Sequence, residues 1–161
     1  MVAILAAAAV LVVGASRNGA GAPAPGTSAG SPASRGEVIF ATGHDASGAV
    51  IPRTATSTGG MMGGGGMMGV SCAGCHGNDG RGRTTQTFTS PDITYGNLTD
   101  PKGMLMPDGT RGPTYADASI RTAVTQGTDP AGARLQSPMP QWQLSDQQWA
   151  DLLAYLKTLR L

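Results

Sequence analysis

The stretch Cys72-Ala73-Gly74-Cys75-His76 constrains this chain more than any other, because it holds both cysteines and one of the two histidines. The pattern C-x-x-C-H is typical of a covalent haem attachment site. Its thiols lie about one helical turn apart, so both can face one ring edge and form thioethers with the two haem vinyl groups. The histidine is then carried beneath the iron, where its imidazole can bind axially. The motif therefore predicts one haem c per chain, attached at Cys72 and Cys75 and ligated by His76.

Three other chemistries use similar residues. A thioredoxin-like redox pair needs a strand before C-x-x-C and a long helix after it, whereas Gly-rich sequence flanks this motif on both sides. A structural zinc site could use Cys72, Cys75 and His76, but zinc usually takes four protein ligands and only the distant His44 remains as a nitrogen donor. A disulfide across two intervening residues closes a very short loop and adds little stability. We favour the haem interpretation.

The composition argues against a nucleic-acid-binding protein. The net charge is only +1 and 4% of the residues are aromatic, so no basic surface with interleaved aromatic side chains is expected. The 161 residues include 25 glycines and 11 prolines, which are too many for a chain that is helical throughout. A haem would itself supply much of the apolar core, which explains how so few aromatic residues can suffice.

The N-terminal part predicts export. Residues 1–15 form an apolar run that is short for a bilayer core of roughly 30 Å and resembles a secretory signal, although the usual positive n-region is missing. Residues 16–33 are mostly Gly, Ala, Pro and Ser, which predicts a disordered, flexible linker. The apolar run is expected either to be cleaved as a signal peptide or to remain as a membrane anchor. Either outcome places the protein in the periplasm or on the outer face of the cytoplasmic membrane.

Two capping boxes predict helices at the two ends of the folded part. Residues 34–37 read S-x-x-E and precede an apolar run, so a helix should begin there and end near Gly43. Residues 145–148 form a second box, followed by apolar side chains at helical spacing. Gly36 would let the two helices approach closely, with Phe40 filling the space beside it. Between them, residues 115–126 have the spacing of another helix.

A low-complexity segment precedes the C-x-x-C-H motif. Residues 59–69 hold two methionine pairs separated by four glycines. Four thioethers could hold Cu(I), because soft metal ions prefer sulfur ligands. Alternatively Met67 and Met68, which lie only a few residues from Cys72, pack over the haem edge and limit the access of water. We favour the second interpretation, and a copper-handling function is the less favoured alternative.

The hydrogen-bond partner of His76 is expected to come from the segment around Pro91. A metal-bound histidine normally donates its other ring N–H to a carbonyl or carboxylate, which fixes the tautomer. The carbonyl of Pro91 is the expected acceptor, and a plain turn without this role is the alternative. Downstream, Met139 lies between Pro138 and Pro140, so its backbone has little freedom and its thioether can be held in a fixed place.

From about Ser34 to Leu161 these pieces resemble the class I c-type cytochromes. The matching features are the helix with Gly36 and Phe40, Cys72-x-x-Cys75-His76-Gly77, the Pro91 segment, the middle helix, Met139-Pro140, and the final helix with Tyr155. The resemblance implies an all-α, cytochrome c-like fold of three to four helices around one covalently bound haem, in a domain over residues 34–161. An insertion over residues 43–70 is far longer than in compact members.

The resemblance also implies which residues surround the haem. Met139 would be the distal iron ligand, because in the family this ligand lies between the middle and last helices. Met104 and Met106, which precede a second proline, and His44 are rivals for this position. The remaining haem surroundings are expected to include Pro91, Met67, Met68, Trp142 and Tyr155.

With both axial positions filled, the iron cannot readily bind substrate, and one-electron cycling is the chemistry that remains. The chain is therefore expected to be an electron carrier with protein redox partners in an exported respiratory or photosynthetic chain, and not an enzyme. The alternative is a cytochrome c subunit of a larger oxidoreductase complex. A vacant distal site would instead indicate a peroxidase-like or gas-binding haem.

Overall fold

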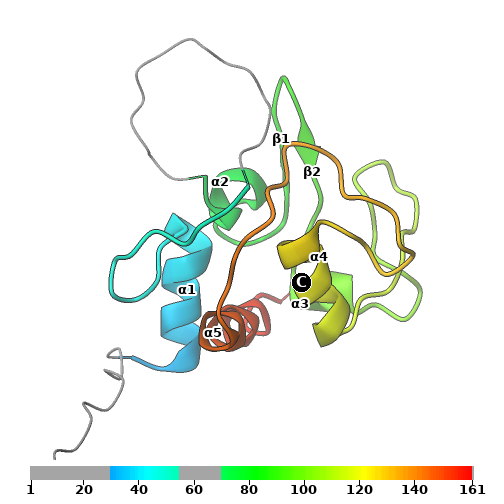
Figure 1. The fold of residues 1–161 in the computed structure, drawn as a ribbon. Coiled ribbons are helices and arrows are strands. Elements are labelled where there is room, and N and C mark those ends of the chain that lie inside the picture. The colour runs from blue at the N-terminus through cyan, green and yellow to red at the C-terminus, as the bar shows by residue number, and fades with distance from the viewer. Residues whose placement is uncertain (1–29, 55–69, 161) are drawn as a thin grey trace, which may run out of the picture.

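The computed structural model describes residues 30–54 and 70–160. The apolar run, nearly all of the expected linker, and the Met-Gly segment with Met67 and Met68 therefore lie outside the described residues. The described elements are α1 (Pro32–Thr42), α2 (Cys72–His76), β1 (Arg83–Thr84), β2 (Thr89–Ser90), α3 (Tyr95–Leu98), α4 (Asp117–Gln126) and α5 (Asp146–Leu156) (Figure 1). No helix within the described ranges is both long and apolar enough to cross a membrane.

Most of the regular secondary structure is helical, as expected, but two details of the prediction are wrong. Five helices are present in the described residues instead of three to four, because α2 and α3 are single turns of 5 and 4 residues. The fold is also not purely α-helical, because β1 pairs with β2 as a small antiparallel sheet. Such short elements contain too few residues for a periodic spacing of apolar side chains to appear in the sequence.

Helix α1 begins two residues before the expected start. Its N-cap is Ser31, whose hydroxyl accepts the N–H of Ser34 at 3.1 Å. Proline at the first helical position adds to this cap, because its φ is already helical and its missing N–H needs no partner. The capping box expected at residues 34–37 is therefore wrong, and the last two residues of the expected linker are helical. The helix ends as predicted at Gly43, which has a φ of 71°.

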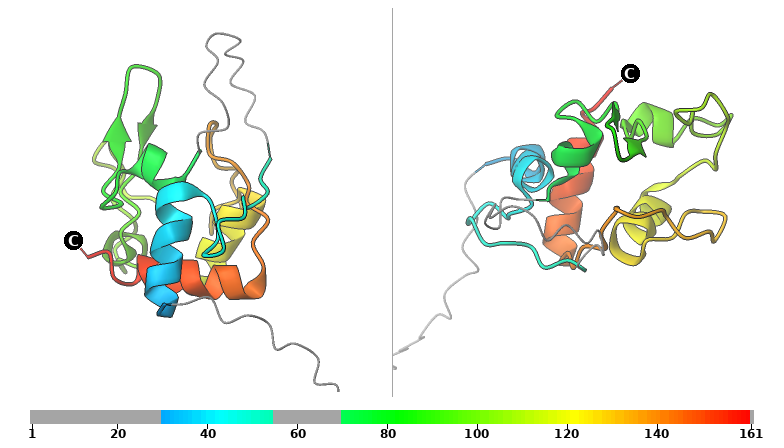
Figure 2. Two further views of the ribbon diagram at one scale, coloured as in Figure 1. Left: turned by 90° about the vertical axis from the view of Figure 1, so that its left-hand side faces the viewer. Right: turned by 90° about the horizontal axis from the view of Figure 1, so that it is seen from above.

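Helices α1 and α5 cross, and α5 lies between α1 on one side and α4 on the other (Figures 1 and 2). Gly36 lies at the crossing, where a Cβ would meet the carbonyl group of Asp151 and the Cβ of Tyr155. Phe40 is 1% exposed, and its ring centroid lies 5.2 Å from that of Tyr155. The close approach predicted from Gly36 and Phe40 is thus confirmed.

An ion pair beside this crossing links the first and last helices. The guanidinium of Arg35 donates from Nε and an Nη atom to both carboxylate oxygens of Asp151, at 2.8 and 2.7 Å. Gln147 donates to the same carboxylate at 3.0 Å. This geometry fixes the register of α1 along α5, because a bidentate pair tolerates little sliding.

The capping box of α5 and the end of α4 match the sequence prediction. The hydroxyl of Ser145 accepts the N–H of Gln148 at 3.2 Å, and the Gln148 side chain accepts the N–H of Ser145 at 2.9 Å. Helix α4 begins at Asp117, two residues later than expected, and ends before Gly127, which has a φ of 66°. Apolar side chains from these helices join the core with Ile51, which is 1% exposed.

A turn after α1 gives a prediction for acid stability. The carboxylate of Asp45 accepts the hydroxyl of Ser47 at 2.6 Å and the N–H groups of Ser47 and Ala49 at 2.9 and 3.0 Å. These bonds, the Ser47 hydroxyl first, hold the pKa of Asp45 below its ordinary value. The unfolded chain therefore binds more protons, so this contribution to stability is present above the ordinary pKa and is lost as the pH falls through the folded value.

We expect Asp45→Asn to lower Tm by about 2 °C at about pH 7, since a screened contact of roughly 0.5 kcal/mol is typical of an exposed site. At about pH 3 or below the difference from the wild type should shrink. Ser47→Ala, which removes the largest cause of the pKa shift, should show the same pH pattern. Thermal unfolding followed by circular dichroism measures both, and a Tm difference that stays constant with pH would contradict the explanation.

Candidate functional site

Helix α2 brings Cys72, Cys75 and His76 together on one turn (Figure 1). The hydroxyl of Ser71 caps this turn by accepting the N–H of Gly74 at 3.0 Å. At the other end, Gly77 has a φ of 80°, a conformation that favours glycine. The two thiols are free and are not joined as a disulfide.

His76 is buried and oriented by a single hydrogen bond. The residue is 7% exposed, and its Nδ1 lies 2.9 Å from the carbonyl oxygen of Pro91. The predicted hydrogen bond to this carbonyl is therefore present, with Nδ1 as donor. Burial lowers the pKa of His76, and the Pro91 carbonyl opposes this effect. The imidazole is thus neutral at ordinary pH, and the lone pair of its Nε2 is left to bind a metal.

The environment of the two thiols weakens the alternative chemistries. Burial raises the pKa of Cys72 to about 12, and burial also raises the pKa of Cys75 although the charge of Arg83 opposes it. A redox-active pair needs a thiol with a lowered pKa, so the thioredoxin-like interpretation is not supported. Across residues 30–54 and 70–160, no three His, Cys, Asp or Glu side chains are grouped to hold a metal ion.

Two strands hold the residues that follow the C-x-x-C-H motif. The hydroxyl of Ser90, at the end of β2, donates to the carbonyl of Cys75. The same hydroxyl accepts the N–H of Arg83 at 3.0 Å, so it links β1, β2 and α2. Ser90 directly precedes Pro91, and this link therefore fixes the carbonyl that orients His76. Sequence reasoning missed Ser90, because a serine in a Thr/Ser-rich stretch carries no distinguishing signal.

Met139 lies in the segment between α4 and α5 and is partly buried. Two neighbouring hydrogen bonds fix this segment: the N–H of Trp142 donates to the Val124 carbonyl at 2.9 Å, and the N–H of Gln143 donates to the Pro52 carbonyl at 2.8 Å. Trp142 is 4% exposed. The Met139 segment is therefore attached to α4 and to the chain that follows α1.

The rival methionines are attached to a different part of the fold. Asn97 accepts the N–H of Leu105 at 2.9 Å and donates to the carbonyls of Asp92 and Leu105 at 2.9 and 3.1 Å. The Met104–Met106 segment is thus tied to the residue next to Pro91, the partner of His76. Met104 is buried in the core, and Met106 packs against that core. Asn97 was not identified from the sequence, and its burial among apolar residues becomes visible only in the fold.

The other expected site residues have defined places. Tyr155 lies at the α1–α5 crossing, and its hydroxyl reaches the carbonyl of Asn78 at 3.5 Å. Trp142 packs against Gly43. The ring of His44 is held by the carbonyl of Thr42, 2.9 Å from its Nδ1. None of these positions by itself assigns contact with a haem.

A family model described as Cytochrome c matches residues 14–160. The chain belongs to the cytochrome c family. Neither curated proteins nor solved structures give a significant match to it. Membership makes this a haem c protein that transfers electrons and is not in itself a catalytic enzyme.

The residues of this cytochrome c family member fit a covalent haem. Two free thiols lie on one helical turn, and the adjacent buried histidine is neutral with one ring nitrogen already used. These are the donors that thioether attachment and axial iron ligation require. Cys72, Cys75 and His76 could therefore hold the group, and Met139 offers a thioether from another segment.

Proposed function

We propose that this protein is a one-electron carrier whose haem is attached at Cys72 and Cys75 and whose iron is ligated by His76 and Met139. The hydrogen bond from His76 Nδ1 to the Pro91 carbonyl carries this proposal. It fixes the tautomer and the ring plane, and it raises the basicity of the nitrogen that remains. A buried histidine without a metal also needs a hydrogen-bond partner, so the two free thiols on the same turn distinguish this histidine from an ordinary core residue.

The assignment of Met139 over its rivals is supported by the way each segment is anchored. Met104 and Met106 belong to the segment that Asn97 ties to Asp92, on the side of the His76 partner. Met139 follows α4 and is anchored away from that segment. A distal ligand must come from a segment that can face the iron from the side opposite to His76, which favours Met139.

The chain's own residues would set the reduction potential of the haem and the access of substrate to its iron. The bound haem supplies one-electron cycling between Fe(III) and Fe(II). A thioether from Met139 would favour the reduced state, and burial of the site would disfavour the extra positive charge of the oxidised state. With His76 and Met139 both holding the iron, no place would be left for substrate, which would distinguish a carrier from a peroxidase-like or gas-binding protein.

We further propose that the protein acts outside the cytoplasm, in the periplasm or at the outer face of the cytoplasmic membrane. The apolar residues 1–15 support export, and the composition of residues 16–33 suits a tether. Its partners would be a protein electron donor and a protein acceptor of a respiratory or photosynthetic chain. A subunit of a larger oxidoreductase is the second possibility, and the protein should then co-purify with that complex from gently solubilised membranes.

Replacing the proposed distal ligand tests the assignment. Met139→Ala should abolish the weak long-wavelength absorption band of Met–Fe(III) ligation, while the covalently attached haem is retained. Its reduction potential should fall by at least about 100 mV, because the thioether favours Fe(II). Met106→Ala is the matched control and should keep the band. Loss of the band in Met106→Ala and its persistence in Met139→Ala would reverse the assignment.

A further inference from the structure

The chain that follows α1 forms a short ladder with the chain that follows Met139. Arg53 and Trp142 are partners in an antiparallel bridge. Three hydrogen bonds flank it: Thr54 N–H to the Gln141 carbonyl at 2.9 Å, Gln143 N–H to the Pro52 carbonyl at 2.8 Å, and Gln141 N–H to the Thr54 hydroxyl at 3.0 Å. We call residues 52–54 with residues 141–143 the ladder. It begins two residues after Met139.

Trp142 fastens the ladder to two helices. Its backbone N–H donates to the carbonyl of Val124 in the last turn of α4. Its ring packs beside Gly43 at the end of α1, where a Cβ would lie 3.0 Å from a ring atom. The guanidinium of Arg53 lies 5.3 Å from the ring centroid. A cation over an indole face is attracted by the ring, so this contact strengthens the pairing.

The other strand of the ladder is fastened to the core. The N–H of Ile51 donates to the carbonyl of Gly43 at 3.0 Å, and Ile51 is 1% exposed. Neither strand is therefore a free loop, and each is tied to a helix within a few residues. A segment held in this way can fix the position of its neighbour, which here is Met139.

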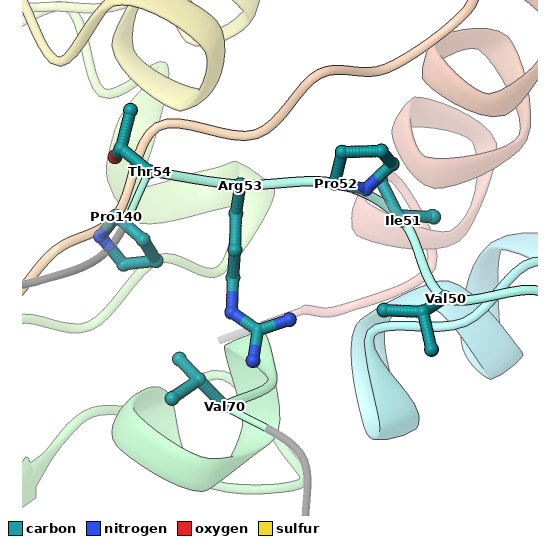
Figure 3. A pocket seen from close by; sticks show the side chains of 7 residues that line it. All are labelled: Val50, Ile51, Pro52, Arg53, Thr54, Val70 and Pro140. Atoms are coloured by element: carbon teal, nitrogen blue, oxygen red, sulfur yellow. The ribbon is translucent and has the colours of Figure 1, made fainter. Parts of the chain in front are cut away.

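The side chain of Arg53 extends toward the chain that precedes the attachment motif. Figure 3 shows its side chain extending from the ladder toward Val70, with Pro140 beside the same hollow. Val70 lies two residues before Cys72, and Pro140 directly follows Met139. Within the described residues, no carboxylate forms an ion pair with Arg53. The side chain thus lies between the two parts of the chain that would hold the haem from different sides.

We propose that the ladder is a positioning device for the distal ligand, with Thr54 and Arg53 as positioning residues that act through the Met139 segment. This proposal rests on the proposed function, because it takes Met139 as the iron ligand. As a soft ligand, the Met139 thioether would bind oxidised iron weakly, so harder ligands such as hydroxide would compete with it as the pH rises. The ladder opposes this replacement, since the segment must leave its hydrogen bonds before Met139 can withdraw.

The test measures, in the haem-containing protein, the pH at which half of the Met–Fe(III) absorption band is lost. We call this pH the midpoint. Thr54→Val keeps the side-chain shape but removes the hydroxyl that accepts the Gln141 N–H. Loss of one such bond should increase the ratio of molecules with Met139 displaced from the iron to those with Met139 bound, on the order of fivefold. This change lowers the midpoint by about 0.7 pH unit. Arg53→Gln should also lower the midpoint, because it removes the cation from the Trp142 ring.

Thr114→Val is the matched control. Thr114 also makes one side-chain hydrogen bond, to the carbonyl of Asp100 at 2.8 Å, but it lies outside the ladder. Its midpoint should equal that of the wild type. Equal midpoints for Thr54→Val, Arg53→Gln and Thr114→Val would overturn the positioning role. A wild-type band that survives in Met139→Ala would instead show that the ligand assignment is wrong, so the two failures are distinguishable.

Discussion

Gly36→Ala is expected to destabilise the folded protein by about 3 kcal/mol or more, near the upper end for overpacking, and to lower Tm by about 10 °C. The added methyl group would overlap the backbone carbonyl of Asp151 and press on the Cβ of Tyr155. Neither neighbour can turn aside by a change of rotamer, so α1 and α5 must separate. Thermal unfolding of the haem-containing protein measures this effect.

Gly112→Ala provides the control for the Gly36 experiment. At Gly112 the nearest atom to a new Cβ is the sulfur of Met106, at 3.3 Å. A flexible thioether can move by a few tenths of an ångström, so this variant should lose less than about 1 kcal/mol. Similar Tm values for the two variants would show that the crossing tolerates a wider separation than its geometry indicates.

The second large effect is expected from the double variant Cys72→Ala, Cys75→Ala. Without the two thiols no thioether can form, so denaturation and organic extraction should remove all haem from the chain. The folded state should also be lost or strongly weakened, because a haem that supplies much of the core would no longer be retained. A haem stain after denaturing electrophoresis, with a spectrum of the extracted material, measures the loss.

Met139→Ala is the control for the cysteine experiment, since it alters an axial ligand but keeps both attachment residues. It should retain covalent haem in amounts similar to the wild type. Covalent haem that remains in the double cysteine variant would refute attachment through Cys72 and Cys75.

The sequence allowed the helical fold, the haem motif and the α1–α5 packing to be predicted, because each depends on local chemistry. C-x-x-C-H is contiguous, and a glycine four residues before an aromatic residue defines one face of a helix. The start of α1 was misassigned because Ser31 and Ser34 are both acceptable caps, and only the Pro32 that follows Ser31 favours the earlier one. The spacing of residues in the sequence does not decide between two N-cap candidates that lie only three positions apart.

The hydrogen bonds that hold the segments around the site could not be predicted, because they join parts of the chain that are distant in sequence. Asn97 spans the gap between Asp92 and Leu105, and Thr54 meets Gln141 across 87 positions. A single polar residue in a loop has no periodicity, and its partner is determined by the packing of the helices around it. The hydrogen bond between His76 and Pro91 was the exception, since metal-bound histidines need such a partner.

The pairing of Arg35 with Asp151 spans 116 positions and determines when the chain can fold. Helix α1 is made before α5, the helix against which Gly36 and Phe40 pack. Closing so long a loop costs conformational entropy before any contact compensates for it. The α1–α5 core therefore forms only after α5 has been synthesised, and until then α1 lacks this partner.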